Sequence, residues 1–578
     1  MKKVKKYILF IILFTGVLSC KKSFLDEKAL DFLSTTNAFV TEADFNASTN
    51  NLYGLVRQHF YTVNDFSPFY YQYRTDAWFD ITVTTPNMSA DMATRGLTNF
   101  AWSPNYKIAS EANTIISRLP GSSLTDAQKK LFEARARFFR AFAYRTLAYL
   151  YGGVPLTLVE ATTPKTDFTR ATRKEVYAQV IEDLKFSVAN LPSLAAPSIK
   201  DGEVSAQAAN HLLSEVYLAD GQFQNAVTAA SAVISDPVMT LMASRFGRRS
   251  TVTPGDVYWD LFQRGNQNRK SGNKEAIWVI QIETDVIGGG GSTSGGSQNG
   301  VYGLERVHSP LLRDVRINGV APFLWPIANY TGGRGVGFLA PDAYYINDIW
   351  QSDFNNDIRN ANHNLVRDFY GNNPASPFFG KLISTKAPPA GSTGINGALI
   401  ANKPDRSIYP YQSKATQVYE PPATLVTASA GVPAAIRNID SLARYYLTAG
   451  AGGTYIDQYM FRLAETYLLR AEAYVGLNNN AAAATDINAV RARVNAAPVL
   501  PGQVTIDYIL DERLREFGVE EKRMLTLMRL GKWVDRVKRF NPFYGSQMLD
   551  YYNLWPIPAN EIEQNRTGKL EQNPGYPQ

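Results

Sequence analysis

The sequence predicts a mainly α-helical scaffold of tetratricopeptide-like helical hairpins that carries a large, loop-rich and partly β insertion. Apolar residues recur at helical spacing near both ends of the chain, and two distant stretches repeat one helix–turn–helix pattern. Gly, Pro, Asn and aromatic residues dominate the middle. We therefore expect a single domain over residues 20–578, with a helical part at 20–238, a loop-rich part at 239–453, and C-terminal helices with a closing segment at 454–578.

Residues 1–19 have the pattern of a secretory signal peptide. Four lysines in the first six residues precede a run of apolar residues that is too short to span a bilayer comfortably. The run ends in Val17-Leu18-Ser19-Cys20, which resembles the bacterial lipobox, where lipid is attached to the cysteine and the chain is cut before it.

Cys20 is the only cysteine of the chain, so it has no intramolecular disulfide partner. We expect this residue to carry acyl chains that tether the mature protein to a membrane, since each buried CH₂ group adds about 0.8 kcal/mol to membrane binding. An uncleaved anchor, or a plain signal peptide with a stray cysteine, is the alternative.

The charge and the aromatic content of the chain indicate which classes of binding partner to expect. The formal net charge is +7, and removal of the four signal-peptide lysines leaves about +3 with no dense basic cluster. This balance argues against a nucleic-acid partner. Aromatic residues make up 12% of the chain and charged residues 19%, a balance that suits binding of neutral polar ligands such as sugars, although aromatic residues also fill cores.

Four stretches have the apolar spacing of helices. The first, at 126–156, ends at Gly152, Gly153 and Pro155, which stop a helix. A second helix is expected at 172–192. The remaining two stretches, at 205–236 and 459–494, each have the pattern of a helix, a tight turn and a second helix.

These last two stretches resemble each other. "AANHLLSEVYLADGQFQNAVTAA" and "LAETYLLRAEAYVGLNNNAAAATDI" both place Ala, Leu and Tyr at helical intervals, turn, and continue with small residues. This is the pattern of a tetratricopeptide repeat, in which small residues let paired helices pack closely. More than 200 residues separate the copies, so a hairpin scaffold interrupted by an insertion fits better than a tandem array.

The inserted part consists mainly of loops. The stretches 286–300 and 386–400 are rich in Gly, Ser and Pro, and a short β-like piece lies at 275–283. Loops held on a rigid scaffold commonly carry binding sites, so we expect this part to face the ligand.

No catalytic motif is found. His59, His211, His308 and His363 show no metal-ligand spacing, and the nucleophile elbow and the P-loop are absent from the sequence. "DERLREFGVEEKR" at 511–523 is rich in carboxylates, as a glycoside hydrolase site would be. Because its charges alternate in sign along a helix, we instead expect ion pairs on a solvated face. We expect no enzyme activity and no cofactor.

One stretch has part of the ligand spacing of a calcium-binding loop. "DFNND" at 353–357 has the Asp-x-Asn-x-Asp spacing of such a loop. Ile358 replaces the expected glycine, and Asn364 replaces the expected glutamate. We expect a turn, with a structural calcium ion as the less favoured alternative.

Five segments, in order behind the lipobox, resemble the SusD/RagB family of surface glycan-binding lipoproteins of Bacteroidota. They are "ARARFFRAFAYRTLAYLYGGVPL", "TRKEVYAQVIEDLKFSVANLP", "MFRLAETYLLRAEAYVGLN", "ILDERLREFGVEEKRMLTLMRLGKW" and "NLWPIPANEIEQNRTGKLEQNPGY". The first ends in the family's aromatic-Gly-x-Val-Pro-Leu turn, and the last contains its Trp-Pro-Ile-Pro and Gln-Asn-Pro-Gly-Tyr ending. The resemblance covers nearly all of the mature chain.

This resemblance implies a non-enzymatic protein, lipid-anchored in the outer membrane and facing the cell surface. It would bind oligosaccharides and pass them to a SusC-type TonB-dependent transporter. One alternative is a peptide-binding lid of a TonB-dependent peptide transporter, since a minority of the family resembles peptide binders. A surface enzyme or an assembly scaffold is the other. One departure concerns the residues after Cys20, where Lys21 and Lys22 precede the acidic residues that favour surface export.

Two stretches are candidates for the ligand site, because a sugar stacks on aromatic rings and hydrogen-bonds to polar side chains. The first, at 70–87, offers Arg74, Asp76, Trp78 and Asn87. The second, at 321–335, offers Trp325 and Tyr330. Burial in the core is the alternative for Trp78 and Trp325. Three other tryptophans are assigned to the scaffold: Trp102, Trp278 and Trp555.

Overall fold

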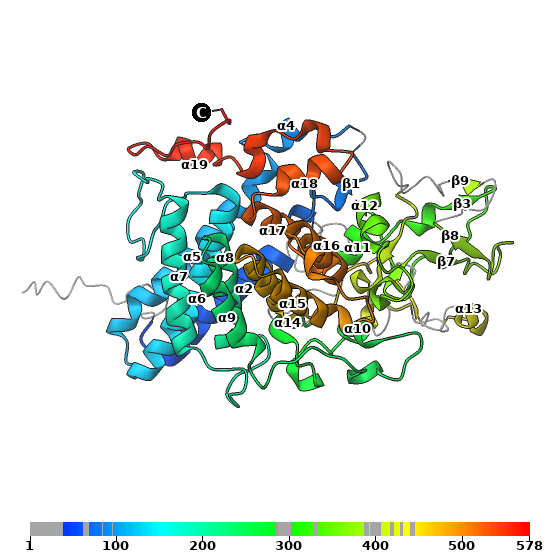
Figure 1. Ribbon diagram of the computed structural model, residues 1–578, viewed down its shortest axis with the longest axis horizontal. Coiled ribbons are helices and arrows are strands. Elements are labelled where there is room, and N and C mark those ends of the chain that lie inside the picture. The colour runs from blue at the N-terminus through cyan, green and yellow to red at the C-terminus, as the bar shows by residue number, and fades with distance from the viewer. Residues whose placement is uncertain are drawn as a thin grey trace, which may run out of the picture.

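Helices form one side of the protein, and loops with short strands form the other (Figure 1). The computed structural model describes residues 39–61, 69–83, 85–94, 96–284, 286, 302–328, 333–385, 392–393, 406–416, 421–427, 432–439 and 445–577. The predictions for the signal peptide, Cys20 and Tyr330 lie outside these residues. None of the helices within them is both long and apolar enough to cross a membrane.

The N-terminal helices pack side by side around one central helix (Figure 1). They are α2 (Glu42–Tyr61), α5 (Trp102–Arg118), α6 (Asp126–Tyr151), α7 (Arg173–Asn190), α8 (Ala206–Ala219) and α9 (Phe223–Ile234). Helix α6 lies between α5 and α7, and every residue at positions 138–151 is buried. A helix that is buried on all sides forms the centre of a core. It begins at a capping box of Thr125 and Gln128 and ends at Gly152, whose φ of 77° favours glycine.

The two look-alike stretches both form helical hairpins, as predicted. Helices α8 and α9 join through Asp220-Gly221, and the second hairpin is α14 (Leu463–Gly476) with α15 (Asn480–Ala492). The hairpins also pack on each other, since α14 contacts both α8 and α9. His211 Nδ1 lies 2.8 Å from Thr466 Oγ1 across this contact. The assignment of these hairpins to the tetratricopeptide class stays a prediction.

The described strands pair in twos, all antiparallel. Strand β2 (Ala276–Ile280) was predicted from the sequence. It pairs with β12 (Gln458–Arg462), so the segments near the two ends of the loop-rich part lie side by side. The others are β1 (Trp78–Asp80) with β5 (Leu339–Pro341), β3 (Arg316–Ile317) with β9 (Ser392–Thr393), β4 (Ile327–Ala328) with β11 (Tyr445–Tyr446), β6 (Leu365–Val366) with β10 (Tyr411–Gln412), and β7 (Asp368–Tyr370) with β8 (Leu382–Ser384).

The remaining α-helices are short or C-terminal. They are α4 (Met88–Asp91), α10 (Val257–Asp260), α11 (Leu304–His308), α12 (Ala343–Ile346), α13 (Ala434–Ile439), α16 (Ile506–Glu516), α17 (Arg523–Arg529), α18 (Trp533–Phe540) and α19 (Ala559–Gln564). The predicted boundaries at 238/239 and 453/454 stay a prediction.

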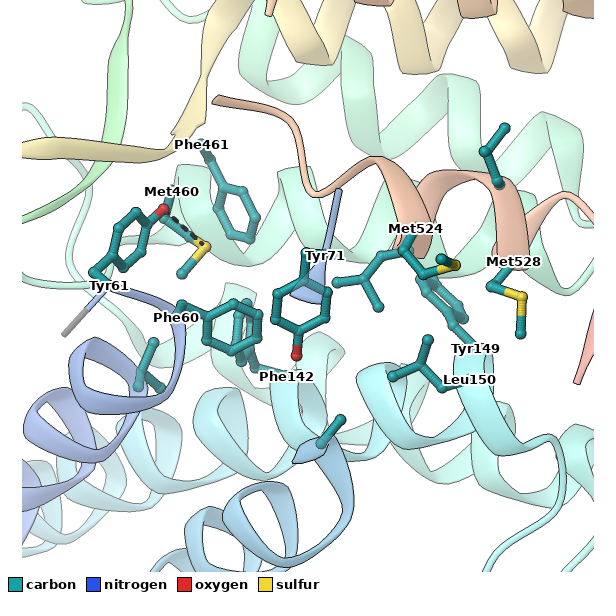
Figure 2. Close-up of a cluster of buried hydrophobic side chains, with 14 of the residues drawn as sticks. Phe60, Tyr61, Tyr71, Phe142, Tyr149, Leu150, Met460, Phe461, Met524 and Met528 are labelled. Atoms are coloured by element: carbon teal, nitrogen blue, oxygen red, sulfur yellow. Dashed lines mark hydrogen bonds between the residues drawn. The ribbon is translucent and has the colours of Figure 1, made fainter. Parts of the chain in front are cut away.

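A single large core joins the two ends of the chain. Figure 2 shows Phe60, Tyr71 and Phe142 from the N-terminal part beside Met524 from α17. The rings of Phe60 and Tyr71 stack with centroids 5.0 Å apart. Trp102, Trp278 and Trp555 are all buried in this core, which confirms their assignment to the scaffold. The N-terminal helices therefore depend on the C-terminal ones for their packing.

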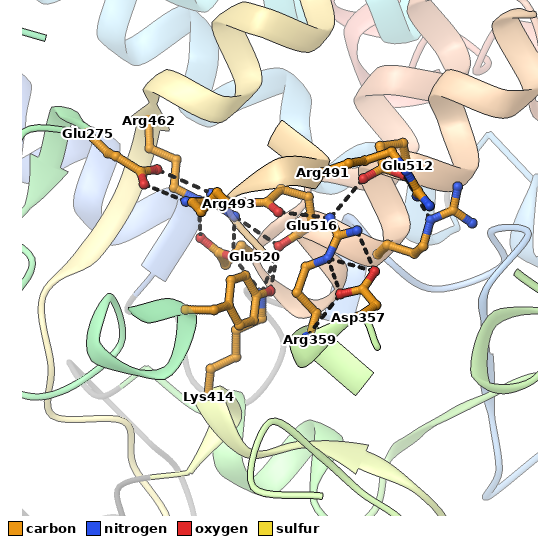
Figure 3. Close-up of polar contacts among 12 residues, drawn as sticks. Glu275, Asp357, Arg359, Lys414, Arg462, Arg491, Arg493, Glu512, Glu516 and Glu520 are labelled. Atoms are coloured by element: carbon orange, nitrogen blue, oxygen red, sulfur yellow. Dashed lines mark hydrogen bonds and ion pairs between the residues drawn. The ribbon is translucent and has the colours of Figure 1, made fainter. Parts of the chain in front are cut away.

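The charged helix α16 is buried, contrary to the prediction of a solvated face. Glu512 and Glu516 are 0% exposed and lie within a network of arginines from other segments (Figure 3). Arg359 donates to Glu512 at 2.8 Å and to Glu516 at 3.0 Å. Burial alone would raise the pKa of Glu512, but Arg359 and its neighbouring arginines hold the pKa below its usual value. These charges are structural ion pairs that tie the loop-rich part to the C-terminal helices.

The stretch 353–357 forms a turn, as predicted. Asp357 pairs with Arg359 at 2.6 Å, and Asp353 accepts a hydrogen bond from Asn356 at 2.9 Å. The carboxylates therefore already have protein partners. Within the described residues, no group of three His, Cys, Asp or Glu side chains could hold a metal ion.

Candidate functional site

Trp325 lies in the loop-rich part, two residues before β4, and is half-buried. The guanidinium carbon of Arg313 lies 4.7 Å from the centroid of its ring, and that of Arg334 lies 5.6 Å away. The indole Nε1 is buried and has no hydrogen-bond partner among the described residues. Trp325 thus forms the centre of a cationic aromatic cluster, which we call the Trp325 cluster: Arg313, Trp325 and Arg334.

The backbone on both sides of Trp325 is held by the fold. The Leu324 N–H donates to Asn372 Oδ1 at 2.7 Å. On the other side, buried Ile327 packs against Val432 and Ile436 at α13, and β4 pairs with β11. A side chain placed between two fixed backbone points is preorganised, which lowers the entropy cost of binding a ligand.

The two arginines differ in their surroundings. The Arg313 side chain is 46% exposed, and its ion pair is a 3.5 Å contact with the exposed Asp314. Arg334 is held through its backbone, since its N–H donates to Glu305 Oε1 at 2.9 Å. The cluster thus presents positive charge beside an indole at the protein surface.

The first predicted cluster lies mostly in the core. Trp78 is 1% exposed, and its ring packs against those of His308 at 4.5 Å and Tyr345 at 4.9 Å. Arg74 and Asp76 are both fully buried. The reason is the pairing of β1 with β5, which covers this segment with the loop-rich part. The prediction that Arg74, Asp76 and Trp78 form part of a ligand platform is wrong, because all three side chains are buried.

These buried residues have structural partners. Asp76 accepts hydrogen bonds from Arg523 at 2.6 Å and from Arg536 at 2.7 Å. Burial would raise the pKa of Asp76, but these two arginines lower it below its usual value. Burial lowers the pKa of His308 to about 3, so this imidazole beside Trp78 stays neutral.

Asn87 is the one residue of this first cluster that remains at the surface. Its Oδ1 caps α4 by accepting the Ala90 N–H at 3.0 Å. This capping role accounts for an asparagine at position 87 and requires no role in ligand binding. The structure thus brings Arg74, Asp76 and Trp78 together in the core and leaves Trp325 elsewhere, beside arginines that the sequence reasoning missed.

The helical side carries a second candidate region that the sequence reasoning also missed. A hollow of about 910 Å³ is lined by α5, residues 155–168 and α19. A neighbouring hollow of about 330 Å³ is lined by Tyr70 and Phe100, whose rings stack with centroids 4.3 Å apart. The recurrence of aromatic residues at Phe100, Trp102 and Tyr106 is the signal that could have indicated this surface.

A third and much smaller hollow borders α6. It has a volume of about 60 Å³ and is lined by residues of α6, α14, α16 and α17. Arg145 lines it, is 4% exposed, and has its nearest carboxylate partner, Glu215, at 3.6 Å. The cavity is large enough for a few water molecules and too small for a sugar. It therefore belongs to the scaffold.

Comparison with known proteins identifies relatives over the whole length of the chain. The profile of the SusD family matches residues 274–576, and a profile described as starch-binding and associating with the outer membrane matches residues 23–218. SusD-like protein P2 of Formosa agariphila is 25% identical over 620 residues, covering 99% of this chain and 100% of the relative. Starch-binding protein SusD of Bacteroides thetaiotaomicron is 36% identical over 121 residues, 20% of this chain and 21% of the relative.

Solved structures share the fold. A laminarin-binding SusD-like protein superposes with a TM-score of 0.63 at 22% identity, covering 93% of this chain and 100% of its own. Surface glycan-binding protein A from Bacteroides thetaiotaomicron, in complex with laminarihexaose, gives a TM-score of 0.63 at 18% identity, covering 92% and 100%. This agreement confirms the helix-rich, SusD-like fold class.

Proposed function

Because this chain belongs to the SusD family, we propose that it binds glycans at the cell surface without altering them. The observation that carries the proposal is the match of the SusD family profile to residues 274–576. Relatives that share the fold are named as starch-binding, laminarin-binding and surface glycan-binding proteins, not as enzymes. Binding without catalysis is also consistent with carboxylates that are occupied by arginines, as in α16.

We place the ligand at the Trp325 cluster. It lies on the loop-rich part, its central ring is half-buried, and its backbone is held on both sides. A half-buried aromatic ring with nearby hydrogen-bond donors is the arrangement that oligosaccharide sites need. Tyr330, the second residue predicted here, stays a prediction.

Delivery to a SusC-type TonB-dependent transporter and anchoring through acylated Cys20 complete the proposal. The first described helix, α2, lies in the helical part, away from strands β7, β8 and β9 of the loop-rich part (Figure 1). A lipid tether attached on the side of α2 would leave the loop-rich part free to bind ligand. The outer membrane is the expected location, since one matching profile carries that description.

A peptide ligand is the second candidate, and one observation favours it. Among the residues that the structure describes, the contacts to the Trp325 ring come from two arginines and not from a second aromatic ring. Charged surroundings suit the backbone and side chains of a peptide as well as a sugar.

Affinity gel electrophoresis of the soluble protein, starting after Cys20, tests the proposal against a panel of polysaccharides. Retardation on at least one glycan is expected, with loss of retardation in Trp325→Ala. Tyr551→Ala is the matched control, because Tyr551 is a 36% exposed aromatic residue in the closing segment. Migration unchanged on every glycan, together with binding to a peptide library, would overturn the glycan assignment.

A further inference from the structure

We propose that the ligand of the Trp325 cluster carries an anionic group, a carboxylate or a sulfate, and is therefore an acidic oligosaccharide. This inference rests on the proposed glycan-binding function and names the class of glycan. Its basis is the combination of two guanidiniums with one indole at a surface of the loop-rich part.

A guanidinium held against an indole is well placed to recognise an anion. A guanidinium that lies over an indole is held by the cation–π attraction, and the ring fixes its plane. The N–H groups at the rim of that plane remain directed sideways, where they match the two oxygens of a carboxylate or sulfate. Arg313 lies 4.7 Å and Arg334 lies 5.6 Å from the same centroid, so an anionic group at the edge of the indole would lie near positive charge.

Arg313 has little competing negative charge. Its contact with Asp314 is 3.5 Å long, and the two side chains are 46% and 55% exposed. An ion pair this exposed is weak, so an incoming anion can displace it. Arg316 positions the loop, because its Nη1 donates to the Arg313 carbonyl oxygen at 2.6 Å.

A comparison within the chain shows what a purely structural arginine–tryptophan contact looks like. The guanidinium carbon of Arg245 lies 6.0 Å from the ring of Trp259. Arg245 is also held by Asp260, a 0% exposed carboxylate that accepts two hydrogen bonds at 2.6 and 3.0 Å. Arg313 has no such buried carboxylate among the residues described, although it lies closer to its indole. An external anion can take the corresponding place.

The indole N–H supports the same conclusion. Trp325 Nε1 is buried and has no partner among the described residues, as is also the case for Trp78 and Trp555, but only Trp325 belongs to a half-buried side chain that a ligand can reach. An acceptor on the ligand would satisfy it. A neutral sugar, in contrast, binds tryptophan by stacking on an open ring face, and here two guanidiniums lie within 6 Å of the ring centroid.

Isothermal titration calorimetry with three oligosaccharides tests the inference: an oligogalacturonate, a sulfated galactan oligosaccharide and neutral laminarihexaose. We expect the soluble wild-type protein to bind one of the two acidic ligands and to bind laminarihexaose at least about tenfold more weakly. Arg313→Gln and Arg334→Gln should each lower the affinity for the acidic ligand about tenfold or more. Raising NaCl from about 50 to about 500 mM should weaken it as well, because salt screens exposed charges.

Lys270→Gln is the matched control for charge. Lys270 is 85% exposed, lies outside the Trp325 cluster in the short turn Arg269–Ser271, and forms an exposed ion pair with Asp201 at 3.2 Å. Its substitution should leave the affinity within about twofold, and circular dichroism should show that all variants keep the wild-type fold.

The possible failures are distinguishable. Equal or tighter binding of laminarihexaose, insensitive to Arg313→Gln, would overturn the acidic class and leave the proposed glycan binding intact. If poly-L-glutamate binds as tightly as oligogalacturonate, the ligand is an acidic peptide and not an acidic glycan. Absence of binding to all three oligosaccharides and to the polysaccharide panel would overturn both proposals.

Discussion

Asp76 and Arg523 form a buried ion pair at 2.6 Å although 447 positions separate them in the chain. Arg536 donates to the same carboxylate at 2.7 Å. All three side chains are 0% exposed. The segment before β1 is thereby fastened to α17 and α18, which makes Asp76 a structural residue although its position in the sequence suggested ligand binding.

Asp76→Asn should destabilise the fold strongly. The substitution leaves two buried guanidiniums without their shared carboxylate, and breaking a buried ion pair costs about 3–5 kcal/mol. Urea unfolding followed by circular dichroism measures the loss. Asp550→Asn is the control, because its partner Lys538 lies on the surface and the Asp550 side chain is 93% exposed. Similar unfolding midpoints for the two variants would contradict the structural role of Asp76.

Stability should fall in acid. Glu512 and Glu516 are buried, yet neighbouring arginines, Arg359 among them, hold the pKa of each below the ordinary value of 4.5. As the pH falls below about 4.5, the unfolded chain takes up protons on these carboxyls before the folded chain does. Their stabilising contribution is therefore complete above that pH and is lost as the pH falls toward the folded-state pKa. Melting temperatures from pH 7 down to pH 3 that stay constant would count against this network.

Two tryptophans should behave differently when replaced by alanine. Trp78→Ala removes a fully buried ring and should cost about 3–5 kcal/mol of unfolding free energy. Trp325→Ala should change stability much less, because this side chain is only half-buried, and should abolish glycan binding. Thermal unfolding and affinity electrophoresis on the same samples separate the two effects. A stable Trp78→Ala variant that no longer binds would restore residues 70–87 as part of the site.

The start of α7 offers a local test. Thr172 and Glu175 form a capping box, in which the Thr172 hydroxyl accepts the Glu175 N–H at 3.2 Å. Thr172→Ala should lower the unfolding free energy by about 1 kcal/mol. Thr163→Ala, in the exposed loop before α7, should leave it unchanged. Equal effects of the two substitutions would show that the cap is not a source of stability.

The helices were predictable because their signals are local. The helix at 126–156 was expected to end at Gly152, and α6 does end there. The apolar periodicity, the turn at Asp220-Gly221 and the small residues of the hairpins are all readable within a short window. Strand β2 was predictable for the same reason.

The site was harder to predict because it depends on contacts between distant segments. Whether Trp78 is exposed depends on the pairing of β1 with β5, more than 250 positions later in the chain. The burial of Glu512 likewise depends on Arg359 from the loop-rich part. The importance of Arg313 follows from its distance to Trp325, which no sequence pattern contains.

Hydrogen–deuterium exchange with and without bound oligosaccharide tests the location of the site most directly. The soluble protein would be saturated with the glycan that retards it most in the electrophoresis panel. Slower exchange on binding in peptides covering 311–328 and 333–340, which contain the Trp325 cluster, is the predicted result. Slower exchange confined to 100–113 and 155–168, which line the hollow beside α5, would contradict it and move the glycan site to the helical part.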